Sequence, residues 1–273
     1  MKRLLTISVL LFASLLYSQS KFDINNLIDR GGLKYAPNDD EPYTGKVFDF
    51  YENGQKKLDG NYRNGLMNGK WTYYHENGQI HGQGRFIDGD GSNPSESSGI
   101  PFNGRSGRWK FWYENGQKSS EKTYKDGKQN GKWTEWYENG QKRGEGTFKD
   151  GKYDGLNANW YENGQKSFEG TYKNGILIGK YELWFEDGTK EWEYYYNYDG
   201  TRDSTKSTTR WYESGQKWYN GYIKTINDTT SEWNGLYTRW HENGQKEAEE
   251  TFKDGIRIES TYWDEEGNVI DDE

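Results

Sequence analysis

The sequence contains no cysteine, only three histidines and only four prolines among its 273 residues. Without cysteine the chain cannot form disulfides, thiolate metal sites, redox pairs or thiol nucleophiles. Aliphatic residues are also scarce, because all hydrophobic residues together make up 30% of the chain and aromatic residues alone 17%. Such a composition is typical of disordered chains, but each Trp or Tyr ring buries about 150 to 250 Å². We therefore expect a folded protein whose core consists of aromatic rings.

A basic surface is missing as well. The formal net charge is −8, and it becomes −10 when the first 18 residues, which include Lys2 and Arg3, are removed. Nucleic acids and anionic lipids attract proteins through an excess of Lys and Arg. The charge therefore argues against a nucleic-acid partner and against direct binding of membrane lipid.

The N-terminus has the proportions of a secretory signal. Lys2 and Arg3 precede an apolar run over residues 4–16, which is followed by Tyr17 and Ser18. A membrane-spanning helix needs about 20 apolar residues, so the run is too short to span. We predict a signal peptide over residues 1–18 with cleavage after Ser18. The mature protein is then exported, soluble, and either periplasmic or extracellular at the cell surface.

An internal repeat dominates the rest of the chain. The tetrapeptide Glu-Asn-Gly-Gln or a variant of it recurs, most often every 24 residues, and a second turn dipeptide such as Asp150-Gly151 follows about a dozen residues later. Both Asn-Gly and Asp-Gly favour type I′ turns, and the stretches between them are rich in Trp, Tyr, Phe and Thr. Each repeat thus predicts a β-hairpin. The glycines of the recurring tetrapeptide are Gly54, Gly78, Gly116, Gly140, Gly164, Gly188, Gly215, Gly244 and, in a degenerate copy, Gly267.

The predicted fold is all-β, an elongated antiparallel meander of stacked β-hairpins. The array covers residues 45–270, after an N-terminal lead-in at 19–44 and before an acidic tail at 271–273. Alignment of the repeats produces three aromatic columns that we expect to form the core. One contains Tyr51, His75 and Tyr113, and another, on the return strand, contains Tyr62, Phe86, Tyr124, Phe148, Tyr172 and Phe252. The third column, which we also expect to form a partly covered binding face, contains Trp112, Trp136, Trp160, Trp184, Trp211 and Trp240.

These motifs resemble the MORN repeat, in its bacterial variant form. The resemblance rests on WYENGQK, an aromatic residue, KDGK and a further Gly, and it covers about residues 45 to 270. It implies stacked hairpins and a role as a scaffold or oligomerisation module. Lipid binding is proposed for some relatives, and some bacterial members are labelled antitoxins. The repeat carries no catalytic residues that could be transferred to this chain.

Departures from the repeat are few. A Gly, Ser and Pro-rich insertion at about residues 88–106 is expected to project as a mobile loop. Asp88, Asp90 and Ser92 alternate as in a calcium loop, but the sixth and twelfth positions hold Asn93 and Gly99, which do not fit one. The three histidines are expected to be structural, with His81 isolated on a return strand. We therefore predict no catalytic, cofactor-binding or metal-binding residues.

Two functions compete on these grounds. The favoured one is a noncatalytic scaffold that binds an unidentified protein or a second copy of the chain through an extended surface. The alternative is binding of a cell-wall or surface glycan by the aromatic columns. An enzyme is not expected, because no nucleophile motif, phosphate loop or metal-ligand spacing is present. Lipid binding and an immunity role against a toxin acting outside the cytoplasm are weaker alternatives.

Overall fold

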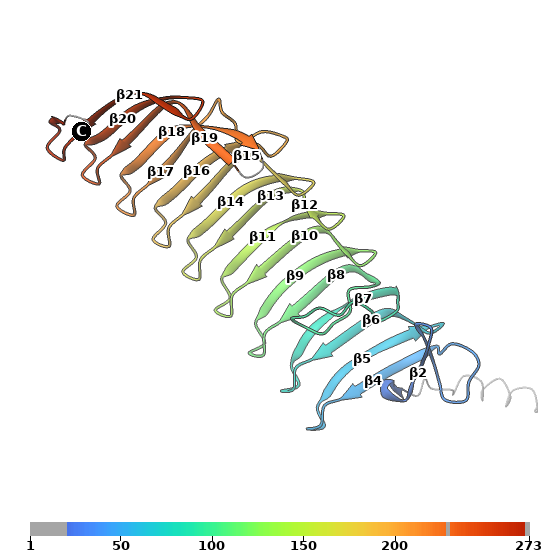
Figure 1. Ribbon diagram of the computed structural model, residues 1–273. Helices are drawn as coiled ribbons and strands as arrows, with labels where there is room; N and C mark the ends of the chain where they lie inside the picture. The colour runs from blue at the N-terminus through green and yellow to red at the C-terminus, as the bar shows by residue number, and fades with distance from the viewer. Residues whose placement is uncertain (1–20, 228–229, 271–273) are drawn as a thin grey trace, which may run out of the picture. The chain divides into compact units, whose positions relative to one another are not determined.

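A computed structural model describes residues 21–227 and 230–270, with the side chain of the strand-end residue 227 left out. The predicted signal peptide, the first two lead-in residues and the acidic tail lie outside the described residues. The chain divides into two compact units, unit 1 up to Gln129 and unit 2 from Asn130. The repeat hairpins of each unit follow one another in an antiparallel sheet (Figure 1). For the described residues the all-β prediction is confirmed, with one 3-10 turn, η1 (Ile24–Asn26), as the exception.

Unit 1 contains a short lead-in and three repeat hairpins. Strand β1 (Phe22–Asp23) pairs in parallel with β4, and β2 (Ile28–Arg30) and β3 (Leu33–Tyr35) form a separate hairpin. From β4 to β9 each strand pairs with the next in antiparallel register. The repeat strands are β4 (Gly45–Phe50), β5 (Lys56–Arg63), β6 (Leu66–Tyr74), β7 (Ile80–Gly89), β8 (Arg105–Trp112) and β9 (Lys118–Lys125).

Unit 2 continues the same pattern, and the unit boundary falls inside β10. Its strands again pair in chain order and in antiparallel register, except that β12 and β13 both pair with β11. They are β10 (Lys128–Trp136), β11 (Lys142–Lys149), β12 (Lys152–Tyr153), β13 (Gly155–Trp160), β14 (Lys166–Lys173), β15 (Ile176–Trp184), β16 (Lys190–Tyr196), β17 (Ser207–Trp211), β18 (Lys217–Asn227), β19 (Thr230–Trp240), β20 (Lys246–Lys253), β21 (Ile256–Trp263) and β22 (Val269–Ile270).

The two turn motifs adopt different conformations. Asp150 and Gly151 both have positive φ, 51° and 82°, which confirms the type I′ prediction there. At Asn139-Gly140 only Gly140 has positive φ, and its N–H donates to the Tyr137 carbonyl at 2.9 Å. This is a three-residue loop with a G1-type bulge, so the type I′ prediction for the Glu-Asn-Gly turns is wrong. The physical reason is that the Asn139 side-chain oxygen accepts the Gln141 N–H at 2.9 Å. This hydrogen bond stabilises the turn without a second residue in the left-handed conformation.

The recurring turn residues also link one hairpin to the next. The Asn139 amide donates to the Glu162 carbonyl at 3.0 Å, and the Tyr137 hydroxyl donates to the Trp160 carbonyl at 2.7 Å. His75 and His241 replace Tyr in this column, and their Nε2 atoms lie 2.9 Å from the corresponding Trp carbonyl oxygens. Both histidines therefore have the predicted structural role. His81 is not isolated, because its ring lies 4.3 Å from that of His75.

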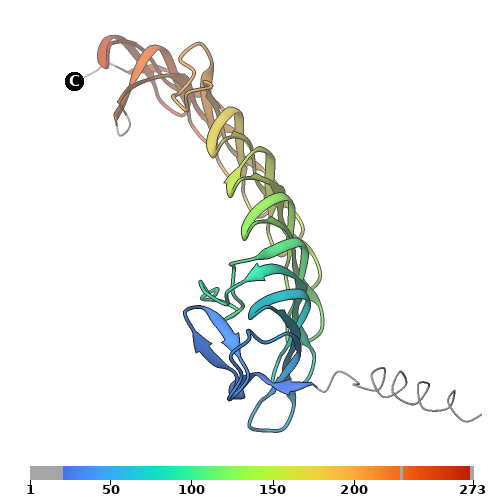
Figure 2. The same cartoon turned by 90° about the vertical axis from the view of Figure 1, so that its right-hand side faces the viewer.

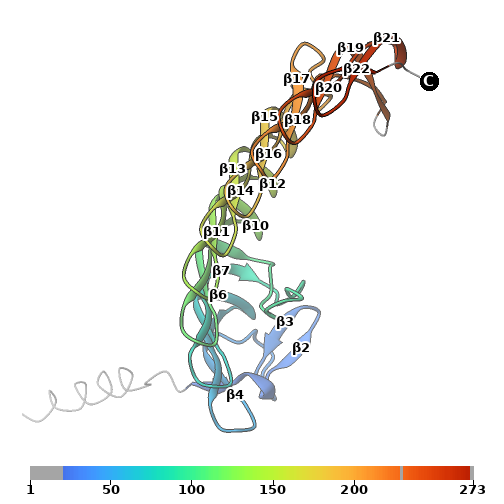
Figure 3. The same cartoon turned by 90° about the vertical axis from the view of Figure 1, so that its left-hand side faces the viewer.

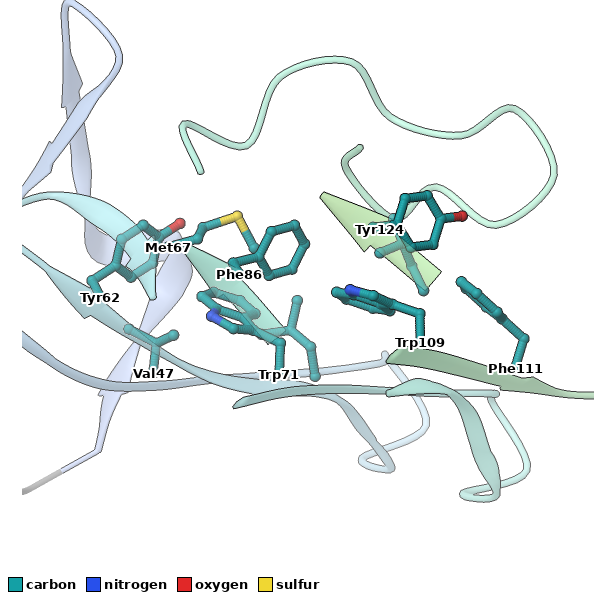
Figure 4. Close-up of a cluster of buried hydrophobic side chains, with 10 residues drawn as sticks. Val47, Tyr62, Met67, Trp71, Phe86, Trp109, Phe111 and Tyr124 are labelled. Carbon is teal, nitrogen blue, oxygen red and sulfur yellow. The ribbon is translucent and has the colours of Figure 1, made fainter. Parts of the chain in front are cut away.

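The core of unit 1 lies on one face of its sheet (Figure 4). The return-strand column is confirmed as core here, since Tyr62, Phe86 and Tyr124 are at most 4% exposed. Their partners are Trp71 and Trp109, each at most 1% exposed, rather than the predicted Trp column. Opposite these rings lie Gly60 and Gly84, where a Cβ would stand 2.1 Å from the nearest indole atom. Glycine is therefore required wherever a core Trp crosses the neighbouring strand.

Two segments outside the repeat cover this face (Figures 2 and 3). The lead-in docks beside the β5–β6 turn, where the Lys34 N–H donates to the Gly65 carbonyl at 3.0 Å. The insertion at 88–106 folds back over the sheet and buries Ile100 completely. Arg105, 1% exposed, holds it there by donating to the Pro101 and Ile100 carbonyls and to the Tyr124 hydroxyl at 2.7 to 2.9 Å. The prediction of a projecting mobile loop is therefore wrong, because Ile100 and Arg105 bind the insertion to the aromatic face.

Candidate functional site

Strand alternation gives each sheet two different faces. The aromatic face carries Trp71 and Trp109 in unit 1 and Trp133 in unit 2, two residues after a glycine of the repeat. The predicted column from Trp112 to Trp240 occupies the opposite face, because it lies three residues further along each strand. We call this second surface the ladder face.

In unit 2 the aromatic face carries two groups of packed rings, one from Trp133 to Tyr172 and the other including Phe168, Tyr181 and later rings up to Phe252. Neighbouring centroids lie 4.3 Å apart for Phe148–Tyr153, 5.3 Å for Tyr153–Tyr172 and 4.6 Å for Trp233–Tyr237. These distances are typical of packed aromatic pairs. We define the open aromatic face as Trp133, Phe148, Tyr153, Phe168, Tyr172, Tyr181, Trp192, Tyr194, Tyr196, Tyr219, Trp233, Tyr237 and Phe252.

This face is only half covered. Trp133 is buried, eleven of the other rings are half-buried, and Tyr153 is exposed at 37%. The equivalent positions of unit 1, such as Tyr62 and Phe86, are sealed by the lead-in and the insertion. Large contiguous apolar surfaces on a soluble protein are typical of interaction sites. The open aromatic face is therefore the candidate functional site.

Two arginines lie on these rings. The Arg202 guanidinium carbon stands 3.7 Å from the Tyr194 ring centroid, and that of Arg210 stands 4.4 Å from Trp192. Both distances permit cation–π attraction. Arg202 Nη1 and Arg210 Nε are buried without a hydrogen-bond acceptor. Burial raises the pKa of Tyr219 to about 12, so its phenol is neutral at physiological pH.

The predicted Trp column is arranged differently. Four half-buried rings of the column in unit 2 face a lysine of the preceding hairpin, as Trp160 faces Lys142 at 4.9 Å and Trp184 faces Lys166 at 5.2 Å. Lys142 also pairs with Glu145 at 2.9 Å. Trp211 and Trp240 face Lys190 and Lys217 at 5.3 and 5.8 Å. Trp112 and Trp136 are half-buried as well.

The ladder face is therefore a periodic surface of tryptophan, lysine and acid. Its strongest charge cluster joins Lys180 and Lys190 to Glu182 and Glu193 at 2.8 to 3.0 Å. Burial opposes ionisation of Glu193, but hydrogen bonds from Lys190, Lys180 and Tyr195 lower its pKa to about 2. Every carboxylate in the cluster is paired, so it has the properties of a structural ion-pair network rather than of a catalytic dyad. Across residues 21–227 and 230–270 no three His, Asp or Glu side chains converge as metal ligands.

The predicted return-strand column includes Phe148, Tyr172 and Phe252 of this face, but its openness in unit 2 was not predicted. The tryptophans of the aromatic face were also missed, although Trp71, Trp109 and Trp133 each follow a glycine by two residues. The aromatic columns on the two faces of the sheet were equally suited to form a core. Side chains alternate between the two faces along a strand, but this alternation does not show which face is covered.

The MORN repeat variant family matches residues 43–64, 67–88, 105–126, 129–150, 153–174 and 233–254. This chain belongs to the MORN-repeat family, whose repeats commonly mediate protein or membrane interactions. No helix among the described residues has the length and apolarity needed to cross a membrane.

Individual proteins resemble this chain only weakly. No curated protein matches the sequence. Three solved structures are weakly similar over 87% of this chain: a crystal structure of TcdB2–TccC3–Cdc42 (12% identity, TM-score 0.22), one of TcdB2–TccC3 (11%, 0.18) and a Photorhabdus luminescens Tc holotoxin pore carrying a TccC3 mutation (12%, 0.19). This chain spans 13 to 14% of the length of those chains. At these TM-scores the likenesses carry no argument about function.

Proposed function

We propose that this protein is a noncatalytic scaffold that binds a partner protein, or a second copy of itself, on the open aromatic face of unit 2. The observation behind the proposal is the contrast between equivalent repeat positions. Met67 and Tyr62 are 3% and 4% exposed under their cover in unit 1, whereas at the equivalent positions of unit 2 Tyr153 is 37% exposed and Tyr172 is half-buried. A folded partner would supply for unit 2 the cover that unit 1 receives from its own chain.

The composition of the face favours a protein partner. Trp, Tyr and Arg are the residues that most often dominate binding energy at protein interfaces. Here Trp192, Tyr194 and Tyr219 are packed with Arg202 and Arg210, so the rings are already held in position. Pre-organised side chains lose little conformational entropy on binding.

The ladder face is the rival surface, and glycan stacking on Trp112, Trp136, Trp160, Trp184, Trp211 and Trp240 is the rival activity. A sugar ring stacking on Trp160 or Trp184 would have to displace Lys142 or Lys166. The open aromatic face is therefore favoured over the ladder face as the binding surface. Lipid binding and an immunity role remain less favoured, and export with a periplasmic or extracellular location is part of the proposal because of residues 1–18.

The test uses charge inserted into the exposed part of the face. Tyr153→Glu and Tyr172→Glu should abolish recovery of the protein that wild type captures from an envelope extract, or abolish the dimer seen by sedimentation velocity. Burying an unpaired carboxylate in an interface costs several kcal/mol. The melting temperature should change little, because both side chains already contact water.

Two variants serve as controls. Tyr198→Glu changes a residue that is 86% exposed and outside the open aromatic face, so association should persist. Trp160→Ala tests the ladder face directly. Loss of association in Trp160→Ala at an unchanged melting temperature, with Tyr153→Glu still binding, would transfer the site to the ladder face and overturn the proposal.

A further inference from the structure

A cleft of about 620 Å³ lies in unit 1 between the lead-in, the aromatic face and the insertion. Its volume falls in the range of small-molecule sites, which is about 300 to 1,000 Å³. Three segments that are distant in sequence form it, and it is separate from the open aromatic face. The floor includes Tyr62, Trp71 and Tyr73, one wall includes Asn25 and Asp29, and the other includes Asp90 and Ser92.

Two phenols in this floor have no hydrogen-bond partner among the described residues. Tyr62 and Tyr73 contribute ring contacts to Trp71 at 5.4 and 6.1 Å, but neither hydroxyl is bonded. The Tyr124 hydroxyl, by contrast, accepts from Arg105. Burial, with a smaller contribution from the Asp29 charge, raises the pKa of Tyr62 to about 12, and burial also raises the pKa of Tyr73. Both phenols remain protonated, so the cleft presents two donors that no described protein group uses.

The charges of the cleft are largely neutralised. Asp29 pairs with Lys34 at 3.0 Å, and Asp49 pairs with Lys57 at 3.0 Å. Asp49 also accepts from the Asn25 amide at 2.8 Å. Asp90 alone has no cationic partner and accepts the Ser92 N–H at 2.8 Å. Such a site has little attraction for a strongly charged ligand but offers donors and acceptors to a neutral one.

We propose that this cleft binds a small neutral polyhydroxylated ligand, namely a sugar residue. The half-buried Tyr73 ring provides apolar contact for the C–H face of the sugar ring. The Tyr62 and Tyr73 hydroxyls donate to ligand oxygens, and the Asp90 carboxylate accepts from ligand hydroxyls. The sheet supplies the two phenols and the insertion supplies Asp90.

The test is calorimetric titration of the intact mature protein with glucose, galactose, N-acetylglucosamine and their disaccharides maltose, lactose and chitobiose. At least one should bind with a Kd below about 10 mM, a limit set by the affinity of a few weak contacts. The double variant Tyr62→Phe, Tyr73→Phe retains both rings and removes only the hydroxyls. We expect it to weaken binding at least tenfold.

Tyr198→Phe is the control, because Tyr198 is 86% exposed and lies outside both the cleft and the open aromatic face, so loss of its hydroxyl should leave the affinity unchanged. Choline is the competing probe, since aromatic rings and one free carboxylate also suit a quaternary ammonium ion. Binding of choline without any sugar would overturn the ligand class. Absence of sugar binding, or equal affinity in the wild type and the double variant, would overturn the site.

Discussion

Units 1 and 2 contain the same repeat but differ in whether other segments cover the aromatic face. In unit 1 the lead-in and the insertion cover the aromatic face, and Trp71, Trp109 and Phe86 are at most 1% exposed. In unit 2 Arg202 and Arg210 lie on the equivalent face, where most rings are half-buried. A single-layer sheet has two faces and cannot bury either without a second layer. The aromatic face of the repeat is therefore buried only where another segment covers it. In unit 1 the chain supplies that cover and the face becomes a core, whereas in unit 2 the face is a candidate interface.

The largest expected effect compares one repeat position in both units. Trp109→Ala should destabilise unit 1 by about 3 to 5 kcal/mol, because it opens a cavity in a closed core. Tyr181→Ala at the equivalent position of unit 2 should cost about 1 to 2 kcal/mol, since part of that ring already contacts water. Urea denaturation combined with hydrogen exchange of peptides from each unit measures both. Equal losses would show that the two faces do not differ in burial energy.

A smaller difference in the loss of stability is expected between substitutions of two arginines, one in each unit. Arg105→Ala should destabilise unit 1 by about 2 to 4 kcal/mol, because the Pro101 and Ile100 carbonyls lose their donor inside the core. Arg210→Ala should cost less than about 1 kcal/mol, since its guanidinium mainly stacks on Trp192 and Trp218.

Limited proteolysis sharpens this comparison. Arg105→Ala should expose the insertion at 88–106 to cleavage, and Arg105→Lys should do so as well, because an ammonium cannot reproduce the forked contacts. An insertion that stays resistant in Arg105→Ala would mean that Ile100 alone holds the cover in place.

The smallest expected effect is a pH dependence confined to unit 1. Burial, followed by the nearby His75, lowers the pKa of His81 in the folded state. Its contribution to stability is complete above the unfolded pKa of about 6.5 and is lost as the pH falls through the folded value. Hydrogen exchange in β7 should therefore accelerate from pH 7 toward pH 5 beyond its intrinsic trend. His81→Gln should remove that excess, and an unchanged pH profile in this variant would assign the effect to another group.

Local features were predictable from the residues. The repeat spacing and the Asp-Gly and Asn-Gly dipeptides are sufficient to predict hairpins, because they act over a few residues and recur. The type I′ turn at Asp150-Gly151 followed from this reasoning. The turn at Asn139-Gly140 did not, since the same kind of dipeptide closes loops of two or three residues and the Asn139 side chain decides between them.

The candidate site was predicted less well than the fold. The tryptophans from Trp112 to Trp240 do lie on one face, as alternation required, but their lysine neighbours come from preceding hairpins. Ring exposure depends on what lies above the sheet. The segments that lie above the sheet are the lead-in and the insertion. Neither belongs to the repeat, so alignment of the repeats gives no indication of where they pack.

By itself the sequence determined the hairpin unit, the three aromatic columns, the family and the glycines that form the turns, all of which depend on residues near one another along the chain. Only the tertiary structure decided which column is buried, that the 88–106 insertion is a lid held by Arg105, and that a cleft opens beside Tyr73. The reason is that strand alternation is symmetric between the two faces of a sheet. Long-range packing of the lead-in and the insertion breaks that symmetry in unit 1, and in unit 2 no described segment of the unit covers the aromatic face in this way.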